Sequence, residues 1–172
     1  FSGKNNIEVT KDSILGRTNE KYERGEISTA QFIESLKKEL DLDITDEEVL
    51  EGWNKIFVGE NFGIRDNIDR LVSKYPLYIF SNTSISHAEF WRNEYSELLK
   101  HFQKIFTSFE VGMRKPEKES FLEVCSQMDV LPEKILFFDD TKENIVAAND
   151  LGMNAVKVDS IQDINKTIEK LC

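Results

Sequence analysis

The sequence predicts an α/β fold, in which a parallel β-sheet is covered by helices on both faces and a small helical region lies beside it. Two observations support this prediction. From residue 76 onward, short apolar runs alternate with stretches of helical character, whereas up to about residue 57 the chain shows helical signals and no convincing strand. With 172 residues, of which 40% are hydrophobic, the chain is long enough to bury a core.

The first part of the chain predicts helices from their start signals. Residues 28–40, "STAQFIESLKKEL", begin with Ser28 and Gln31 in the spacing of a capping box and then place apolar residues on one face. Residues 45–57 repeat this pattern, and residues 62–75 form a further expected helix.

The second part of the chain alternates strands and helices, which is typical of a parallel sheet. The expected strands are residues 77–80, 104–109, 135–138 and 154–158. The expected helices are residues 87–99, 116–128, 142–152 and 160–172, with Pro116 as a favoured first-turn residue. We therefore divide the chain into a helical domain, residues 1–58, and a sheet-bearing domain, residues 59–172.

Composition limits the partners and the compartment. A formal net charge of −10 argues against nucleic acid and an anionic membrane as partners, because an acidic surface repels both. No apolar run approaches the roughly 20 residues that cross a bilayer, and the opening "FSGKNNIEVTKDS" lacks the apolar centre of a signal peptide. Cys125 and Cys172 show neither metal-binding spacing nor an obvious pairing, which favours a reducing compartment. We therefore expect a cytoplasmic protein.

Polar residues follow three of the expected strands where each strand ends. In parallel α/β sheets, ligands bind at the carboxyl ends of the strands, so these residues are the candidate site. Each group alone also has an ordinary explanation: the acids can cap the next helix, the polar triplet can form a turn, and the lysine can lie in solvent. The combination favours a site. Its members are Ser81, Asn82, Thr83, Lys115, Asp139 and Asp140.

The chemistry of these groups suits a phosphate together with a divalent cation. Adjacent carboxylates raise each other's pKa unless a cation neutralises them, and Mg²⁺ prefers oxygen ligands of this kind. The ammonium of Lys115 is a compact charge that can oppose phosphate oxygens. Ser81, with the backbone N–H groups around it, can hold a phosphoryl oxygen where charge develops.

The motifs formed by these residues resemble those of the haloacid dehalogenase (HAD) superfamily. "FSNTS", "GMRKPE" and "FFDDTKEN" look like its second, third and fourth motifs. The likeness is closer still to the subgroup that contains bacterial α-D-glucose-1-phosphate phosphatase. Further segments that resemble this subgroup are "ERGEIS", "GW", "FW" with "EY", and "ANDLG".

This resemblance implies a Rossmann-like core with a small helical cap inserted after the first strand. It also implies Mg²⁺-dependent phosphoryl transfer through an aspartyl-phosphate, with a small phosphorylated metabolite, for example a sugar phosphate, as substrate. By position, Ser81 would bind the phosphoryl group with Asn82 beside it, and Lys115 would stabilise its charge.

The same resemblance implies the metal site. Asp140 would ligate Mg²⁺, and Asp139 would either be a further ligand or hold the metal-binding groups in place without touching the metal. Asn144 stands where many relatives have an acid and would support the metal site more weakly, with Thr83 as another supporting residue.

The sequence departs from the family pattern at its first motif, a strand ending in Asp-x-Asp whose first Asp is the nucleophile. No such strand precedes "ERGEIS". Asp41-x-Asp43-x-Thr45 has similar spacing, but it follows a lysine-rich helix, and Thr45 is already explained as a helix cap. We therefore expect the 172-residue chain to be inactive alone, and exposed edges at a missing central strand would favour self-association.

Two other functions remain open from the sequence. A degenerate HAD domain could bind phosphate or a protein partner without catalysis. Haloacid dehalogenation uses the same fold but no metal, so the acidic pair disfavours it.

Overall fold

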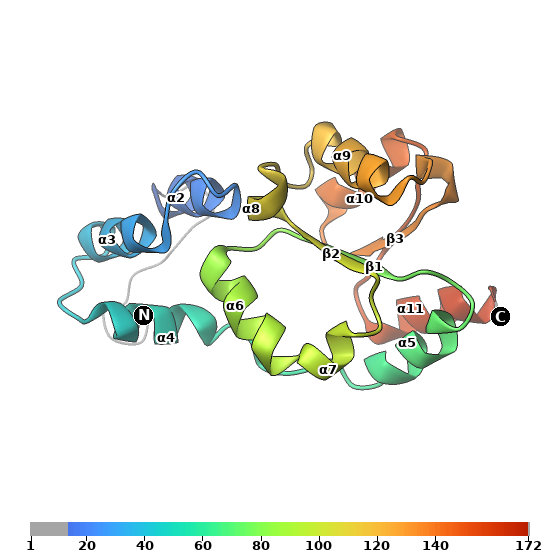
Figure 1. Ribbon diagram of the computed structural model, residues 1–172, viewed down its shortest axis with the longest axis horizontal. Coiled ribbons are helices and arrows are strands. Elements are labelled where there is room, and N and C mark those ends of the chain that lie inside the picture. Colours follow the sequence, from blue (N-terminus) through green and yellow to red (C-terminus); the bar gives the residue numbers. More distant parts are fainter. Residues whose placement is uncertain (1–13, 172) are drawn as a thin grey trace.

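The computed structural model describes residues 14–171. Helices α2 (Ile14–Glu23), α3 (Thr29–Glu39) and α4 (Asp46–Asn54) form a helical layer at one end of the molecule (Figure 1). The expected capping boxes are confirmed. The Ser28 hydroxyl accepts from the Gln31 N–H and the Gln31 side chain accepts from the Ser28 N–H, and Thr45 and Glu48 bond in the same way at the start of α4. These helices share one apolar cluster, whose buried members are Tyr22, Phe32, Ile33, Leu36, Leu40 and Val49. The domain boundary at residue 58 stays a prediction.

The rest of the chain alternates short strands and helices. Its elements are α5 (Ile64–Val72), β1 (Tyr78–Ser81), α6 (Ile85–Glu94), α7 (Ser96–Leu99), β2 (Lys104–Thr107), α8 (Ser108–Val111), α9 (Lys118–Met128), the 3₁₀ helix η1 (Pro132–Lys134), β3 (Leu136–Asp139), α10 (Lys142–Asp150), β4 (Asn154–Lys157) and α11 (Ile161–Glu169). Helices α9 and α10 lie on one side of the strands, and α5 and α11 lie on the other (Figure 1). This arrangement confirms the α/β class with helices on both faces.

The strands pair in parallel, as expected, but they form two sheets. Within residues 14–171, β1 pairs only with β2 and β3 pairs only with β4, so the parallel sheet is divided into two two-stranded ladders. The facing edges of β1 and β3 share no ladder hydrogen bonds. Self-association through such edges stays a prediction.

Apolar packing joins the two sheets. Phe121 of α9 contacts Phe80 of β1 and Phe137 of β3 edge to face, with ring centroids 5.6 and 5.5 Å apart. Cys125 lies in the same buried cluster as a free thiol, and burial raises its pKa. Its place in the core agrees with a structural role, whereas Cys172 lies outside the described residues.

Most expected elements differ from the structure by a few residues at their ends, and three of these differences have a clear local cause. The strand expected over residues 104–109 stops at Thr107, because Ser108 already begins α8. Pro116 precedes α9 instead of occupying its first turn, since the helix begins at Lys118.

The helix expected over residues 87–99 starts earlier and is broken. Ser84 caps α6 by accepting from the His87 N–H, so the helix begins at Ile85, and it ends before Tyr95, where α7 follows. Asp41 lies in the turn after α3 with a φ of 49°, so the Asp41-x-Asp43 spacing belongs to a helix junction and not to a strand end.

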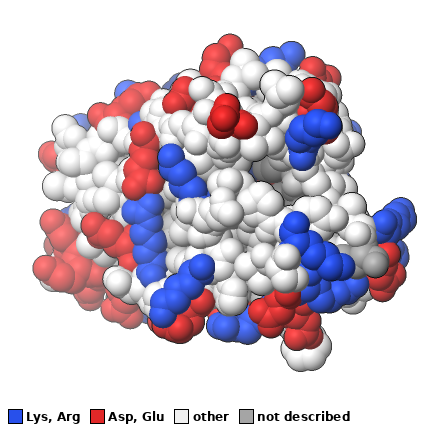
Figure 2. Space-filling view, turned by 45° about the vertical axis from the view of Figure 1, so that its right-hand side comes forward, with Lys and Arg blue, Asp and Glu red and all other residues white. Residues whose placement is uncertain are grey.

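Charges of both signs share one face of the molecule. Figure 2 shows Lys and Arg side chains interspersed with Asp and Glu side chains on one face. Among the residues described, no helix combines the length and apolar character needed to cross a bilayer.

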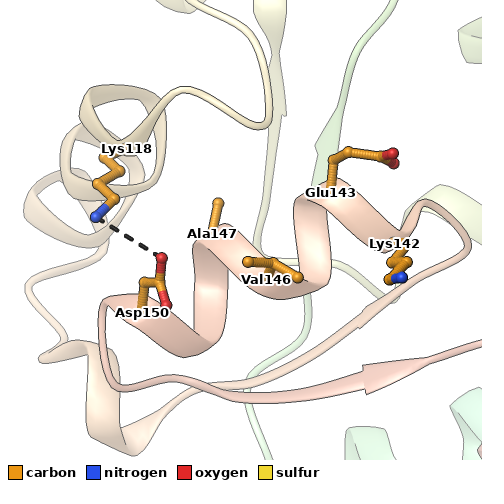
Figure 3. Close-up of a pocket in the computed structure, with 6 residues that line it drawn as sticks. All are labelled: Lys118, Lys142, Glu143, Val146, Ala147 and Asp150. Carbon is orange, nitrogen blue, oxygen red and sulfur yellow. Dashed lines mark ion pairs between the residues drawn. The ribbon is translucent and has the colours of Figure 1, made fainter.

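A shallow hollow of about 300 Å³ lies between α9 and α10 (Figure 3). Lys118 and Asp150 face each other across it at 3.8 Å, and both side chains are more than half exposed. A solvated pair of this kind contributes little to stability or specificity. The groups that the sequence singles out gather elsewhere.

Candidate functional site

Lys115 is the centre of the candidate site. Its ammonium donates to the Phe80 carbonyl oxygen of β1 at 2.7 Å and to Asp139 Oδ2 of β3 at 2.6 Å. The residue is only 7% exposed, and its Nζ also lies 5.1 and 5.4 Å from the ring centroids of Phe80 and Phe137. One side chain therefore links the ends of the two sheets.

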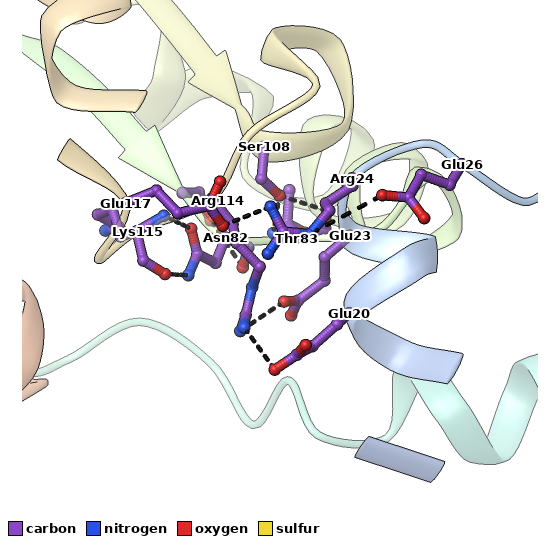
Figure 4. Close-up of polar contacts among 11 residues, drawn as sticks. Glu20, Glu23, Arg24, Glu26, Asn82, Thr83, Ser108, Arg114, Lys115 and Glu117 are labelled. Carbon is purple, nitrogen blue, oxygen red and sulfur yellow. Dashed lines mark hydrogen bonds and ion pairs between the residues drawn. The ribbon is translucent and has the colours of Figure 1, made fainter. Parts of the chain in front are cut away.

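Asn82 fixes the backbone of this lysine. Its side-chain amide donates to the Lys115 carbonyl at 2.8 Å, and its Oδ1 accepts from the Lys115 N–H at 2.9 Å. Asn82 follows β1 directly, so the turn after β1 and the loop before α9 are joined at two points (Figure 4). The strand-end turn and the lysine loop thus form one unit.

Asp139 is a buried and fully engaged carboxylate. Besides its ion pair with Lys115, its Oδ1 accepts from the Thr141 N–H at 2.8 Å and from the Asn144 amide at 2.9 Å. Burial alone would raise the pKa of Asp139, but the charge and hydrogen bond of Lys115, aided by these two donors, hold that pKa below its ordinary value. Asp139 is therefore ionised at neutral pH.

Asp140 has the opposite environment, since it is exposed to solvent at the end of β3. The Thr141 hydroxyl lies 3.5 Å from its Oδ1. No group of three or more Asp, Glu, His or Cys side chains in the described part of the chain is arranged around a metal-sized site. The donors still fit Mg²⁺, which proteins hold with one or two carboxylates while water and substrate phosphate complete its shell.

Ser81 and Thr83 flank Asn82 but face different surroundings. Ser81 is partly exposed at the end of β1 and lines a cavity larger than the hollow beside α10, which is described below. Thr83 is buried: its N–H and carbonyl bond the Ser108 hydroxyl, and its own hydroxyl accepts from the Trp91 indole at 3.3 Å. Thr83 thus anchors the turn to α8 and α6, and none of these contacts reaches the acidic pair.

A cavity of about 530 Å³ extends from the end of β1 to the helical layer. Its walls include Trp53 of α4 and His87 of α6, whose rings stack with centroids 4.7 Å apart, and Asn19 and Glu23 of α2. Burial lowers the pKa of His87, although its hydrogen bond to the Trp53 carbonyl opposes this shift. A stacked aromatic pair and polar side chains therefore line the same cavity as Ser81.

The charged residues on both sides of Lys115 have a role that the sequence does not reveal. Arg114 and Glu117 form ion pairs with residues at the end of α2, about 90 residues earlier in the chain (Figure 4). All of these charges except Glu20 lie in the segments "ERGEIS" and "GMRKPE", but no local signal shows that the two segments meet.

Comparison with known proteins gives consistent matches. A family model described as "Hydrolase: haloacid dehalogenase-like hydrolase" matches residues 8–152. D-ribitol-5-phosphate phosphatase from Bacteroides thetaiotaomicron is 26% identical over 149 residues, which cover 84% of this chain and 72% of that protein.

Solved structures of similar fold extend this result. A HAD family enzyme from Bacteroides thetaiotaomicron, solved in complex with magnesium and inorganic phosphate, matches with a TM-score of 0.74 and 26% identity, covering 86% of this chain and 75% of that one. A predicted HAD-like family hydrolase from Porphyromonas gingivalis matches with a TM-score of 0.82 over 99% of this chain and 84% of that one; at 24% identity this likeness supports the fold alone. The finer resemblance to α-D-glucose-1-phosphate phosphatases stays a prediction.

Proposed function

This chain belongs to the haloacid dehalogenase-like hydrolases, and on that premise we propose that it carries the phosphate-binding and metal-binding residues of a Mg²⁺-dependent phosphatase. The substrate class is a small phosphorylated metabolite, a sugar or polyol phosphate. The similarity to a D-ribitol-5-phosphate phosphatase supports this class.

The donor geometry of Lys115 carries the proposal. An ammonium has three N–H donors, and within the described residues two of them have protein acceptors, the Phe80 carbonyl and Asp139 Oδ2. The third remains for an oxygen of the phosphoryl group. Because Asn82 fixes the backbone and Asp139 accepts a hydrogen bond from Nζ, the ammonium is oriented before a ligand arrives.

The remaining roles follow from position and burial. The Ser81 hydroxyl, at the end of β1 and open to the larger cavity, would hold a second phosphoryl oxygen with Asn82 beside it. The exposed Asp140 would ligate Mg²⁺, and the buried Asp139, braced by Asn144, would orient Lys115. When bound, the metal would neutralise charge on the phosphate.

The nucleophile does not come from Asp139 in this proposal. One of its oxygens faces Lys115 and the other accepts two hydrogen bonds, so neither is available to attack phosphorus. The 172-residue chain alone would then bind phosphate without forming an aspartyl-phosphate on Asp139.

The test compares this chain with a version extended at its N-terminus by the upstream coding sequence. Both are assayed with p-nitrophenyl phosphate and D-ribitol 5-phosphate, with Mg²⁺ and with EDTA. We expect Mg²⁺-dependent turnover only from the extended protein, and a loss of about 100-fold or more in Lys115→Met. Lys118→Met is the matched control, because Lys118 is an exposed lysine nearby on α9. Equal turnover by both lengths, or turnover in EDTA, would contradict the proposal.

A non-catalytic phosphate-binding domain is the second candidate. The observation that favours it is that both carboxylate oxygens of Asp139 already accept hydrogen bonds. The same assay separates the two, because an extended protein that binds inorganic phosphate but hydrolyses neither ester would be a binding domain.

A further inference from the structure

The loop that carries Lys115 is tied to the helical layer by ion pairs on both of its sides. Arg114 lies 3.0 Å from Glu20 Oε1 through Nη1 and 2.9 Å from Glu23 Oε2 through Nη2. Glu117 pairs with Arg24, which directly follows α2. Figure 4 shows these side chains converging from the α2 end and from the loop.

The order of charges makes this contact specific. The α2 end presents the acids Glu20 and Glu23 and then the base Arg24. The loop presents the base Arg114 and then the acid Glu117, so each charge meets its opposite. Four of the side chains are partly shielded, with exposed fractions of 21% for Arg114, 14% for Glu23, 25% for Arg24 and 32% for Glu117, whereas Glu20 is 50% exposed. Shielded pairs are screened less by salt than surface pairs.

A close backbone contact lies at the same place. Gly25 has a φ of 71°, and a Cβ added to it would lie 2.8 Å from the Phe109 carbonyl oxygen of α8. The end of α2 therefore touches the sheet-bearing part of the chain through backbone as well as charge.

We propose that these ion pairs, which we name the α2 clamp (Glu20, Glu23 and Arg24 with Arg114 and Glu117), position Lys115 for its ligand. The clamp holds the side chains on both sides of Lys115, and Asn82 holds the Lys115 backbone through two hydrogen bonds. Movement of the helical layer away from the sheets breaks the clamp and releases the loop. Lys115 then loses its fixed direction toward Phe80 and Asp139.

Arg24, Arg114 and their partners are thus positioning residues, since they act through Lys115. The contact itself rests on geometry alone, whereas its importance for phosphate binding rests on the proposed function of Lys115. The two parts need separate readouts.

The first readout is the rate at which an amine-specific reagent labels the Lys115 ammonium, measured by peptide mass spectrometry in the absence of phosphate. Because Lys115 is 7% exposed, labelling requires local opening of the loop. We expect Arg24→Glu and Glu117→Arg each to accelerate labelling about five-fold or more. The double variant, which restores opposite charges, should return to the wild-type rate.

Lys37→Gln is the matched control, because it removes an ion pair of 3.0 Å with Asp46 inside the helical layer and should leave Lys115 labelling unchanged. If Arg24→Glu or Glu117→Arg does not fold, Glu117→Gln takes its place, because it only neutralises the charge. Single variants that label at the wild-type rate, or a double variant that labels as fast as they do, would overturn the clamp.

The second readout is protection of Lys115 from labelling by inorganic phosphate with Mg²⁺. We expect protection in the wild type and at least a five-fold higher phosphate concentration for half-protection in the clamp variants. Wild type without protection would refute Lys115 as a phosphate ligand while leaving the clamp intact. Equal half-protection in all variants would overturn the positioning role.

Discussion

Replacing Asp139 by asparagine tests whether the Lys115–Asp139 pair stabilises the site as the structure indicates. The variant leaves an ammonium that is 7% exposed without its counter-ion. Removing one partner of a buried pair costs about 3–5 kcal/mol, and we expect about 3 kcal/mol because the asparagine Oδ1 can still accept from the Thr141 N–H. The free energy of unfolding is measured by urea titration at neutral pH.

The pH dependence of the same variant checks the cause. The folded-state pKa of Asp139 is below the ordinary value of 3.8, so its contribution to stability is complete above that value and disappears as the pH falls through the folded-state pKa. The stability difference between wild type and Asp139→Asn should therefore shrink in acid. Asp140→Asn is the control and should change the free energy by about 0.5 kcal/mol or less, since Asp140 is exposed. A loss below about 1 kcal/mol for Asp139→Asn would refute the reasoning.

Three further substitutions test the surroundings of the site. Because burial lowers the pKa of His87, its contribution is complete above 6.5, and the wild type should lose stability relative to His87→Gln in urea titrations as the pH falls from about 7 to about 5. Gly25→Ala should lower the free energy of unfolding by about 1–3 kcal/mol, more than Gly112→Ala, which shares a positive φ but has open space around it. Asn82→Ala removes both bonds to the Lys115 backbone, so we expect a loss of about 1–3 kcal/mol in the same titration and faster amine labelling of Lys115.

Features that depend on neighbouring residues were predictable from the sequence. The capping box of Ser28 and Gln31 needs only residues three apart, and the structure confirms it. The alternation of strands and helices after residue 76 and the parallel pairing were equally accessible, because the apolar runs carry both signals. Local signals failed at Ser108, where a polar residue in an otherwise strand-like run begins a short helix.

Features that depend on distant contacts were not predictable. Nothing in the apolar pattern of residues 77–80 or 135–138 shows that their strands belong to separate ladders, since the pattern encodes burial and not the identity of the neighbouring strand. The α2 clamp is hidden for the same reason. Its charges look like ordinary solvated residues until the fold brings Arg24 beside Glu117.

The adjacent acids at the end of β3 are compatible with folding because they have different surroundings. Successive side chains of a strand point to opposite sides, so neighbours need not share an environment. Asp139 is buried against the ammonium of Lys115, and Asp140 lies in solvent, where water screens its charge. The repulsion that two buried carboxylates would suffer is therefore largely avoided without a metal. In the proposed function, this separation lets Asp139 orient the lysine while Asp140 is open to Mg²⁺. Replacing both Lys115 and Asp139 by apolar residues should therefore preserve the fold better than it preserves phosphate binding.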